Sequence, residues 1–536
     1  MKNLSLLRRL FGGAAAFICC FSCVDVNDEL GKNLLPTNQQ YDIYTAEYYI
    51  DDMELRMADS LSGYSSTRMT LGAIRDDDFG LTTRGTAITL VPLCDSLDFG
   101  QNPVFKRFRF KATRDTISIP SESERYIMQN INVYELSEPL DDEHDYFCGT
   151  KVKYNPERIS KGTPLYTGGD TLSFDFTKSF GEKYMQILQS DLDTLPDYLK
   201  KFPGIYMNVD SPIGKGGRIN MFKVGIEYDS SYGYLTGTYA ELKFTSTYDG
   251  ERKDTSFYFY YSPTSIMAAD SVLANGGTVN QYAFNTSTYS SDDLTGKIQG
   301  STYHVEGAAG VKPVISAAML REKSREAISQ YCNPDEAIIT KATVILPFVT
   351  PDDYKTLEFY PPRLCPNVKV HTDTSVYYAN LTDYSVSTED QGDINRMQGY
   401  YSPDITYHLQ QIINDEKKTS SNYDVWFLVN SSEETTTTNS ANSDLSDYYK
   451  QLAYSSYYNS MYGGYGYGGY GSYGSSYSNY YSYMLAAQYA SSSSSYTSTE
   501  MVLDKDKYFN GVLYAPGETT ESKRPKIKIT FAVPKE

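Results

Sequence analysis

The sequence has few of the residues on which catalytic and metal sites are usually built. Its four histidines, at positions 144, 304, 371 and 408, lie far apart and form no HExxH segment, and no GxSxG segment is present. The sequence therefore contains neither the HExxH signature of a zinc protease nor the nucleophile turn of an α/β-hydrolase. The single tryptophan, Trp426, lies inside an apolar segment, which weakens the case for a sugar-stacking platform, although tyrosine can substitute.

Cysteine is also scarce beyond the first 23 residues. The four that follow are Cys94, Cys148, Cys332 and Cys365. None has CxxC spacing, so a zinc site is not predicted, and no other metal or cofactor is expected. An even number permits disulfides, and if they form, one pair within each half is the expected arrangement. The alternative is that these cysteines are buried apolar residues.

Three further cysteines, at positions 19, 20 and 23, end a short apolar run that follows Lys2, Arg8 and Arg9. This pattern is typical of a signal peptide, because the run is too short to span a bilayer. Ser22 is the only small residue directly before a cysteine. We therefore predict cleavage after residue 22 and lipidation of Cys23, whose acyl chains would hold the protein at a membrane. The alternatives are an ordinary secretory peptide and an uncleaved membrane helix.

The chain is acidic. Its formal charge is −19, and removal of residues 1–22 takes away three cations and no acid, which changes the charge to −22. Such a balance repels nucleic acid. Residues 23–40 form an acidic tether, which is similar to the export signal of Bacteroidota surface lipoproteins. A solvated linker is the alternative.

Alternation of apolar and polar residues predicts a mainly β protein. The pattern recurs in both halves, in segments that end with 526–533. Because the chain is too long for one core, we expect two tandem antiparallel β-sandwich (jelly-roll-like) domains, at 41–248 and 256–536, joined at the polar stretch 246–256.

Few helices are expected. The strongest pattern begins at Ser402 as cap and Pro403 as first helical residue, and it has an apolar stripe through Ile405, Leu409 and Ile412. Two more helices are predicted at 317–331 and 180–188.

A low-complexity tract interrupts the second domain at about 431–500. It is rich in Ser, Thr, Gly and Tyr and nearly devoid of aliphatic residues, so it cannot bury enough surface to form a core. We predict a long disordered insertion between two strands. It is either a Tyr-rich tether for surface contacts or a tolerated loop.

Two acidic clusters contain oxygen ligands that calcium prefers. Asp76, Asp77 and Asp78 form the first, and residues 141–145 form the second. A turn in which an aspartate caps its own backbone explains the first cluster equally well. For His408, beside the stripe of its helix, we expect a partly buried structural role.

Several segments together resemble a known family. These are "LGKNLLP" (30–36), "LGAIRDDDFGLTTRGTA" (71–87), "INVYELSEPLDDEHDY" (131–146), "YHVEGAAGVKPVIS" (303–316), "IITKATVILPF" (338–348) and "YPPRL" (360–364). Their order is similar to that in the exported Bacteroidota lipoproteins grouped as domain-of-unknown-function family 4270. The resemblance covers most of the chain apart from the Tyr-rich tract. It implies an outer-membrane lipoprotein and supplies no catalytic residues.

Two functions follow as hypotheses. The first is a non-catalytic lipoprotein, anchored in the outer membrane and facing the cell exterior, that binds glycan or adhesion targets or is an accessory subunit of an outer-membrane protein complex. The second is an extracellular polysaccharide hydrolase, because the 67 acidic residues leave room for a carboxylate pair.

Overall fold

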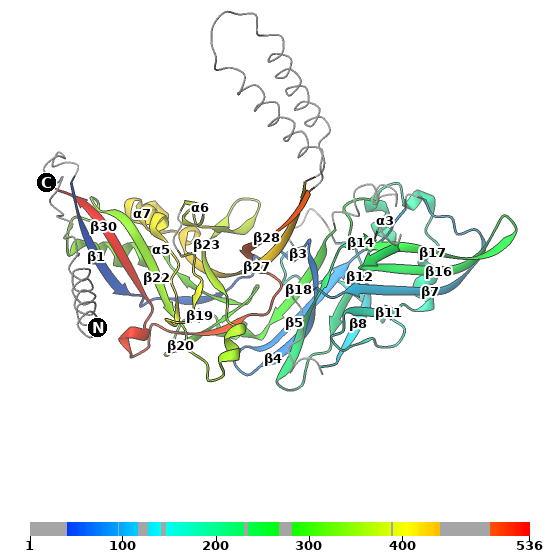
Figure 1. Cartoon of the computed structure of the whole chain (residues 1–536), viewed down its shortest axis with the longest axis horizontal. Helices are drawn as coiled ribbons and strands as arrows, with labels where there is room; N and C mark the ends of the chain where they lie inside the picture. The colour runs from blue at the N-terminus through cyan, green and yellow to red at the C-terminus, as the bar shows by residue number, and fades with distance from the viewer. Residues whose placement is uncertain are drawn as a thin grey trace, which may run out of the picture.

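The fold is mainly β, as the strand patterns predict, and it consists of two β-rich units arranged along one axis (Figure 1). The computed structural model describes residues 40–94, 96–115, 127–140, 146–229, 234–266, 281–386, 390–439 and 494–535. Each unit has its own large hydrophobic core. The first unit comprises residues 62–289, and the second comprises 40–61 together with 290–535.

The first unit packs two antiparallel sheets around its core. One sheet has nine strands, with β10-β8-β12-β5-β18-β3 as its main path and β4, β9 and β13 attached, and the other has the order β11-β7-β16-β17-β6. The strands of the unit are β3 (Tyr64–Ser65), β4 (Arg68–Asp76), β5 (Gly80–Ile88), β6 (Leu90–Pro92), β7 (Gln101–Thr113), β8 (Gln129–Leu136), β9 (Tyr154–Arg158), β10 (Leu165–Tyr166), β11 (Thr171–Asp175), β12 (Ile205–Val209), β13 (Gly216–Lys223), β14 (Ile226–Asp229), β15 (Tyr234–Gly237), β16 (Tyr239–Tyr248), β17 (Glu251–Tyr261) and β18 (Ala283–Tyr289).

The expected alternation is confirmed in the core of this unit. Phe108 and Phe110 on β7 are fully buried, and Phe110 stacks on Phe174 of β11 with ring centroids 4.7 Å apart. Helix α2 (Lys178–Tyr184), which starts at the Thr177 cap, adds Tyr184 to the same cluster. The short η3 (Gln189–Asp191) and helix α3 (Leu195–Lys201), which the sequence patterns did not predict, follow it.

The second unit contains two larger sheets and a two-stranded ribbon. Their orders are β1-β30-β22-β26-β25, β19-β2-β21-β27-β23-β24 with β28 attached, and β20-β29. The strands are β1 (Tyr41–Tyr49), β2 (Glu54–Met57), β19 (Gly296–Lys297), β20 (Thr302–Glu306), β21 (Val311–Ile315), β22 (Ile338–Pro347), β23 (Arg363–His371), β24 (Val376–Asn380), β25 (Ile394–Asn395), β26 (Tyr400–Tyr401), β27 (Val425–Asn439), β28 (Ser494–Leu503), β29 (Asn510–Tyr514) and β30 (Lys526–Pro534).

Helices α5 (Ala317–Ser329) and α7 (Thr406–Asn414) pack on β1 and β22. The remaining helical segments are α6 (Asp383–Val386), η4 (Ser290–Leu294), η5 (Tyr354–Glu358), η6 (Glu416–Thr419), η7 (Ser421–Tyr423) and η8 (Glu521–Lys523). Helix α7 starts later than the pattern at Ser402 predicts. The amide of its first residue, Thr406, donates to the nearby Asp404 (2.9 Å), and the next two amides, those of Tyr407 and His408, donate to the carboxylate of Asp383, which is distant in sequence.

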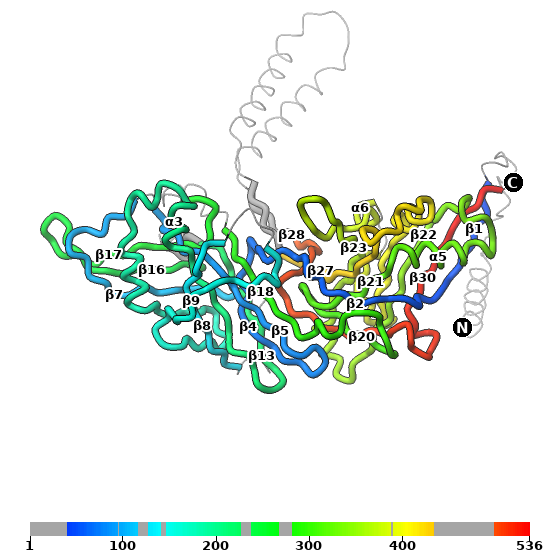
Figure 2. The backbone as a smooth tube through the Cα atoms, turned by 180° about the vertical axis from the view of Figure 1, so that it is seen from behind, coloured from blue at the N-terminus to red at the C-terminus, as the bar shows by residue number. Residues whose placement is uncertain are grey.

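The two units are not tandem, because the N-terminal strand belongs to the second one. Strand β1 pairs antiparallel with β30 from Tyr41↔Pro534 to Tyr49↔Lys526, and the two strands lie at one end of the molecule (Figure 2). Strand β2 pairs with β21 of the same unit. The expected domain 41–248 is corrected accordingly. The first unit is an insertion between β2 and η4, since alternation within a strand does not identify its partner.

The expected boundary at 246–256 is also corrected. Residues 239–261 form the hairpin β16–β17, with Thr245 opposite Asp254 and Tyr248 opposite Glu251. Asp249 and Gly250 at its tip have positive φ values of 51° and 81°. The polar composition of this stretch therefore reflects a solvent-exposed turn. Residues 256–261 belong to the first unit, where Phe259, Tyr260 and Tyr261 are fully buried.

The tract expected at 431–500 begins and ends in paired strands. Strands β27 and β28 pair without interruption from Asn430↔Leu503 to Asn439↔Ser494. Thr and Ser residues at both ends of the tract thus continue a sheet, consistent with the β propensity of threonine. The centre of the tract, 440–493, lies outside the described residues.

The two units meet across a buried polar junction. Arg68 of β4 binds Asp115 of its own unit (3.1 Å) and Glu433 of the second unit (2.8 Å). Asp506 of the second unit lies 3.6 Å from the same guanidinium. Burial, reinforced by the nearby carboxylate of Asp504, raises the pKa of Asp506 to about 6.

Candidate binding cleft

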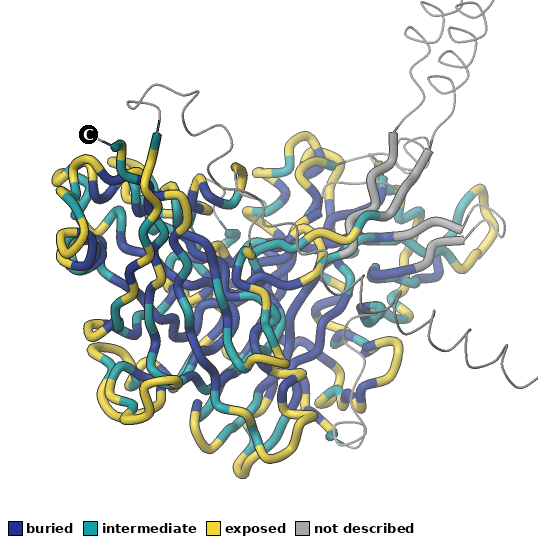
Figure 3. The backbone as a smooth tube through the Cα atoms, turned by 60° about the vertical axis from the view of Figure 1, so that its left-hand side comes forward, coloured by how far each residue is buried: buried dark blue, intermediate teal, exposed yellow. Residues whose placement is uncertain are grey.

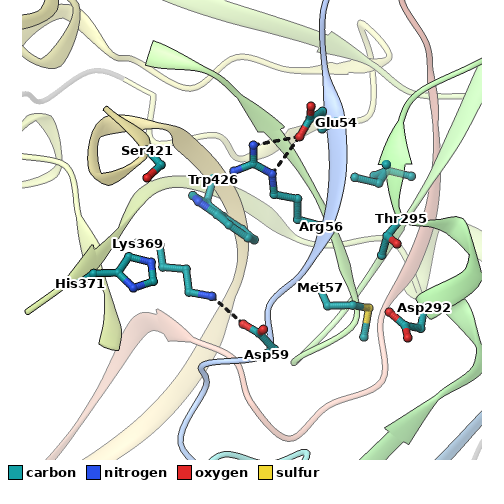
Figure 4. A pocket seen from close by; sticks show the side chains of 12 residues that line it. Glu54, Arg56, Met57, Asp59, Asp292, Thr295, Lys369, His371, Ser421 and Trp426 are labelled. Atoms are coloured by element: carbon teal, nitrogen blue, oxygen red, sulfur yellow. Dashed lines mark hydrogen bonds and ion pairs between the residues drawn. The ribbon is translucent and has the colours of Figure 1, made fainter. Parts of the chain in front are cut away.

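A cleft of about 460 Å³ opens in the second unit between β2, η4, β23 and β27 (Figure 4). Its size lies within the range of about 300–1,000 Å³ that is usual for ligand sites. Its lining is mostly polar and carries both signs of charge. The lining residues are Glu54, Leu55, Arg56, Met57, Asp59, Asp292, Thr295, Gly296, Lys369, His371, Ser421 and Trp426.

Trp426 forms the aromatic part of the wall. On β27, Val425 and Phe427 face the main core of the second unit, whereas Trp426 and Leu428 face a small separate cluster. Trp426 as a whole is 4% exposed, and its indole contacts the ring of Tyr378 edge to face, with centroids 5.4 Å apart. The expectation that Trp426 lies inside an apolar strand is correct, but its alternate position directs the ring to the cleft.

Two cations lie over the indole ring. The Arg56 guanidinium is 5.9 Å and the Lys369 ammonium 5.6 Å from the ring centroid. Distances of this size allow a cation–π attraction. A sugar or aromatic ligand that stacked fully on the indole would have to displace one of these side chains.

Arg56 is fixed by two carboxylates. It donates to Glu54 through Nε (3.0 Å) and to Asp424 through Nη1 (3.0 Å). Burial opposes its charge, but these partners together raise the pKa of Arg56 above its ordinary value. Asp424 also accepts from the backbone amide of Ala317 (3.0 Å), which ties the cleft wall to the start of α5.

Lys369 bridges the cleft to Asp59, with 2.7 Å between Nζ and Oδ1 (Figure 4). The lysine side chain is mostly buried, whereas the aspartate side chain is largely exposed. A ligand carboxylate or hydroxyl can therefore replace Asp59 on this ammonium without uncovering the lysine. This exchangeable position is the main chemical feature of the cleft.

The cleft is less suited to glycoside hydrolysis. That reaction needs a protonated carboxyl group opposite a second carboxylate. Here Glu54 and Asp424 accept from Arg56, and Asp59 accepts from Lys369. These three carboxylates are already engaged by cations, so binding by charge and hydrogen bonds fits these contacts better than acid catalysis.

The first acidic cluster forms a turn at the tip of the β4–β5 hairpin. Asp76 Oδ1 accepts from the amides of Asp78 (2.9 Å) and Phe79 (3.2 Å), as the alternative interpretation predicts. Asp77 pairs with Lys215 at 2.8 Å. Within the described ranges, no three Asp, Glu, His or Cys side chains converge as metal ligands. Residues 141–145, including His144, lie outside them, as does Cys23.

The other histidines lie in three separate places. His371 lines the cleft, and the ring of His304 contacts that of Phe79 edge to face at 5.1 Å. His408 is buried, as expected, with Nε2 3.0 Å from the backbone oxygen of Tyr423, and burial lowers its pKa to about 4. The four cysteines that the structure describes are free thiols, so the disulfides that their even number permits are not formed; Cys148 and Cys365 are buried, as the alternative interpretation predicts.

Two buried ionisable side chains near the junction, Lys312 and Glu306, were missed at the sequence level. The Lys312 ammonium on β21 donates to the backbone oxygens of Glu306, Ala308 and Gly310. Burial lowers its pKa to about 7 and raises that of Glu306, whose carboxylate accepts from Thr82 of the first unit (2.6 Å) and from Ser291. The sequence feature that could have indicated this buried lysine is its position inside the apolar segment "VKPVIS".

Comparison with known proteins identifies no relative. No family model, no curated protein and no solved structure matches the chain. Among the residues described, no helix has the length and apolar character needed to cross a bilayer.

Proposed function

We propose that the chain is a non-catalytic lipoprotein of the bacterial outer membrane that faces the cell exterior and binds an extracellular glycan through the Trp426 cleft. The observation that carries the proposal is the exchangeable ion pair, in which a mostly buried Lys369 beside an indole holds a largely exposed Asp59. Hydroxyl and carboxylate groups of a glycan are suitable replacements for that partner.

The arrangement of the chain supports an anchor at Cys23. Strand β1, the first described element after the tether, lies at one end of the molecule, and the first unit lies at the opposite end (Figure 1). An anchored chain would therefore hold the first unit away from the lipid, with the cleft between the two ends. The Bacteroidota family named above would also fit such a lipoprotein.

Anchoring is tested by substitution of single cysteines. Cys23→Ala should block processing or release the protein from membranes, whereas Cys19→Ala and Cys20→Ala should leave fatty-acid labelling intact. Labelling that persists in Cys23→Ala would contradict the assignment. Affinity capture from intact membranes with the wild-type chain then distinguishes a subunit of an outer-membrane complex from a free glycan binder.

Glycan binding is tested on a panel of acidic and neutral oligosaccharides. Lys369→Met should lower affinity about tenfold or more, because a hydrogen bond to a charged group contributes roughly 1.5–3 kcal/mol. The matched control is Lys200→Met, which removes a lysine from a surface pair with Asp197 at 2.8 Å in the first unit. Equal binding by the two variants would exclude the cleft, and turnover of a glycan would favour the hydrolase.

A further inference from the structure

The sheet at the terminal end of the molecule has an outer face with an apolar patch. In strands β1, β30 and β22, the inward side chains Ala46, Ile529 and Ala342 form one buried row. The register places Ile43, Ala532 and Ile338 in a corresponding row on the outer face. Ile43 is 71% and Ile338 47% exposed. Tyr41, in the neighbouring row opposite Pro534, is 48% exposed.

The same outer face carries several lysines, although the chain as a whole has a formal charge of −19. Beyond the apolar row, the register places three lysines and one glutamate on this face. These residues are Lys341, Lys526, Lys528 and Glu47. Glu47 pairs with Lys526 at 3.1 Å. The face thus combines exposed apolar side chains with exposed lysines.

The position of the patch indicates which surface it can contact. Both ends of the described chain lie here, as Figure 1 shows, and Figure 3 shows exposed segments at this end. Sixteen residues separate Cys23 from Gln40, a span of at most about 60 Å when fully extended. A lipid on Cys23 would therefore keep this face, more than any part of the first unit, close to a bilayer.

We propose that this face, which we call the terminal face, docks on the lipid surface that holds the Cys23 anchor. Tyr41, Ile43 and Ile338 insert among the headgroups, where aromatic and apolar side chains are favoured. Lys341 and Lys528 face anionic phosphates, which attract basic residues near a membrane. The inference rests on the proposed lipidation of Cys23.

The test uses the full lipidated chain in vesicles of phosphatidylethanolamine and phosphatidylglycerol that contain a nitroxide-labelled lipid. An environment-sensitive fluorophore is attached to Ile43→Cys, to Ile338→Cys or to Ile213→Cys, and the unsubstituted chain gives the background from native thiols. Ile213 is a matched control because it is a fully exposed isoleucine of the first unit. Insertion to headgroup depth predicts quenching about twofold stronger at positions 43 and 338 than at 213. Replacement of phosphatidylglycerol by phosphatidylcholine should reduce the difference.

Sedimentation with the vesicles separates the two proposals. If the wild-type chain fails to sediment, the assignment of Cys23 as a lipid anchor is wrong, and the docking proposal, which rests on it, is overturned as well. If it sediments but positions 43 and 338 are quenched no more than position 213, the docking alone is overturned. Dimerisation in detergent that Ile43→Glu abolishes would show that a second copy covers the face, which also overturns lipid docking.

Discussion

Replacement of Arg68 by methionine should weaken the junction between the units strongly. The Arg68 side chain is 7% exposed and is surrounded by Asp115, Glu433 and Asp506. Two of these acids come from the second unit, so one cation of the first unit neutralises a charge cluster that both units share. Methionine retains the unbranched stem of the side chain as far as the position of Nε and removes the guanidinium group, with its charge and hydrogen bonds.

Loss of one partner from a buried ion pair costs about 3–5 kcal/mol, because the remaining charge stays buried and uncompensated. Arg68→Met removes the one cation that three carboxylates share, so we expect a loss in the upper part of this range. Arg109→Met is the matched control. Arg109 binds Asp175 at 2.7 Å with similar two-point geometry, but its side chain is 43% exposed. Exposed pairs contribute only about 0–1 kcal/mol.

The loss of unfolding free energy in Arg68→Met should depend on pH, and the titration of Asp506 determines whether it grows or shrinks as the pH rises. Its pKa in the folded protein is raised to about 6, mainly by burial, while the positive charge of Arg68 acts to lower it. The charged form of Asp506 therefore opposes folding above this pH, and protonation relieves that cost as the pH falls. Without Arg68 the pKa should rise further. The deficit of Arg68→Met should consequently be larger at pH 7.5 than at pH 5.

Urea unfolding at pH 5 and pH 7.5 measures the loss of unfolding free energy and its pH dependence, and hydrogen exchange shows where in the chain protection is lost. Peptides from β4 and β27 should lose protection first in Arg68→Met and retain it in Arg109→Met. A deficit below about 1 kcal/mol, equal to that of the exposed control, would refute the view that this cluster holds the units together. A deficit that is constant from pH 5 to pH 7.5 would refute the part assigned to Asp506.

Three further predictions concern the cores and the tract. Replacement of 440–493 by a short turn should change unfolding free energy by less than about 2 kcal/mol, because β27 and β28 remain paired and loop-closure cost changes slowly with length; denaturant titration measures this change. Phe110→Ala should cost about 3–5 kcal/mol in the first unit, since the ring is fully buried between Phe174 and Tyr261, and hydrogen exchange should show little change in peptides of the second core. A thiol reagent should modify Cys94 and Cys332 well before Cys148 and Cys365 in the native protein, because only the latter two are buried; mass spectrometry of quenched samples gives the order.

Local patterns predicted the strands well, because the period of two that buries one face of a sheet is a property of each segment alone. Phe108 and Phe110 on β7, and Ile527 and Ile529 on β30, are buried as their alternation indicates. Which strands pair with one another in a sheet was not predictable in the same way, because pairing depends on segments that are distant in sequence. The hairpin at 246–256 resembled a linker because exposed turns and linkers share a polar composition.

The candidate cleft was still less accessible to sequence reasoning. Trp426 and Lys369 lie on neighbouring strands, whereas Arg56 and Asp59 come from a segment more than 300 residues earlier. No spacing rule connects such positions. The start of α7 shows the same limit in part, because two of its first three amides donate to Asp383 through a tertiary contact and the other donates to Asp404 instead of the expected Ser402.

The pairing of the two chain ends leads to a prediction that a tandem arrangement would not make. Strand β30 lies between β1 and β22, and Ile527, Ile529 and Phe531 are fully buried on it. Burial of each contributes roughly 1.5–3 kcal/mol, so deletion of 526–535 should remove an amount comparable to the whole stability of a domain. Deletion of the N-terminal strand, residues 41–49, should destabilise the same unit, because β1 also packs on β30 and α5. In both truncated chains, hydrogen exchange should show loss of protection in β22 and α7 while β7 and β16 of the first unit stay protected. A finer pair of variants is Ile529→Ala, with an expected cost of about 2–5 kcal/mol, and Lys528→Ala on the outer face, with less than about 0.5 kcal/mol. If removal of 41–49 instead exposed β7 and β16 and left β22 protected, the N-terminal strand would belong to the first unit and the discontinuous arrangement would be wrong.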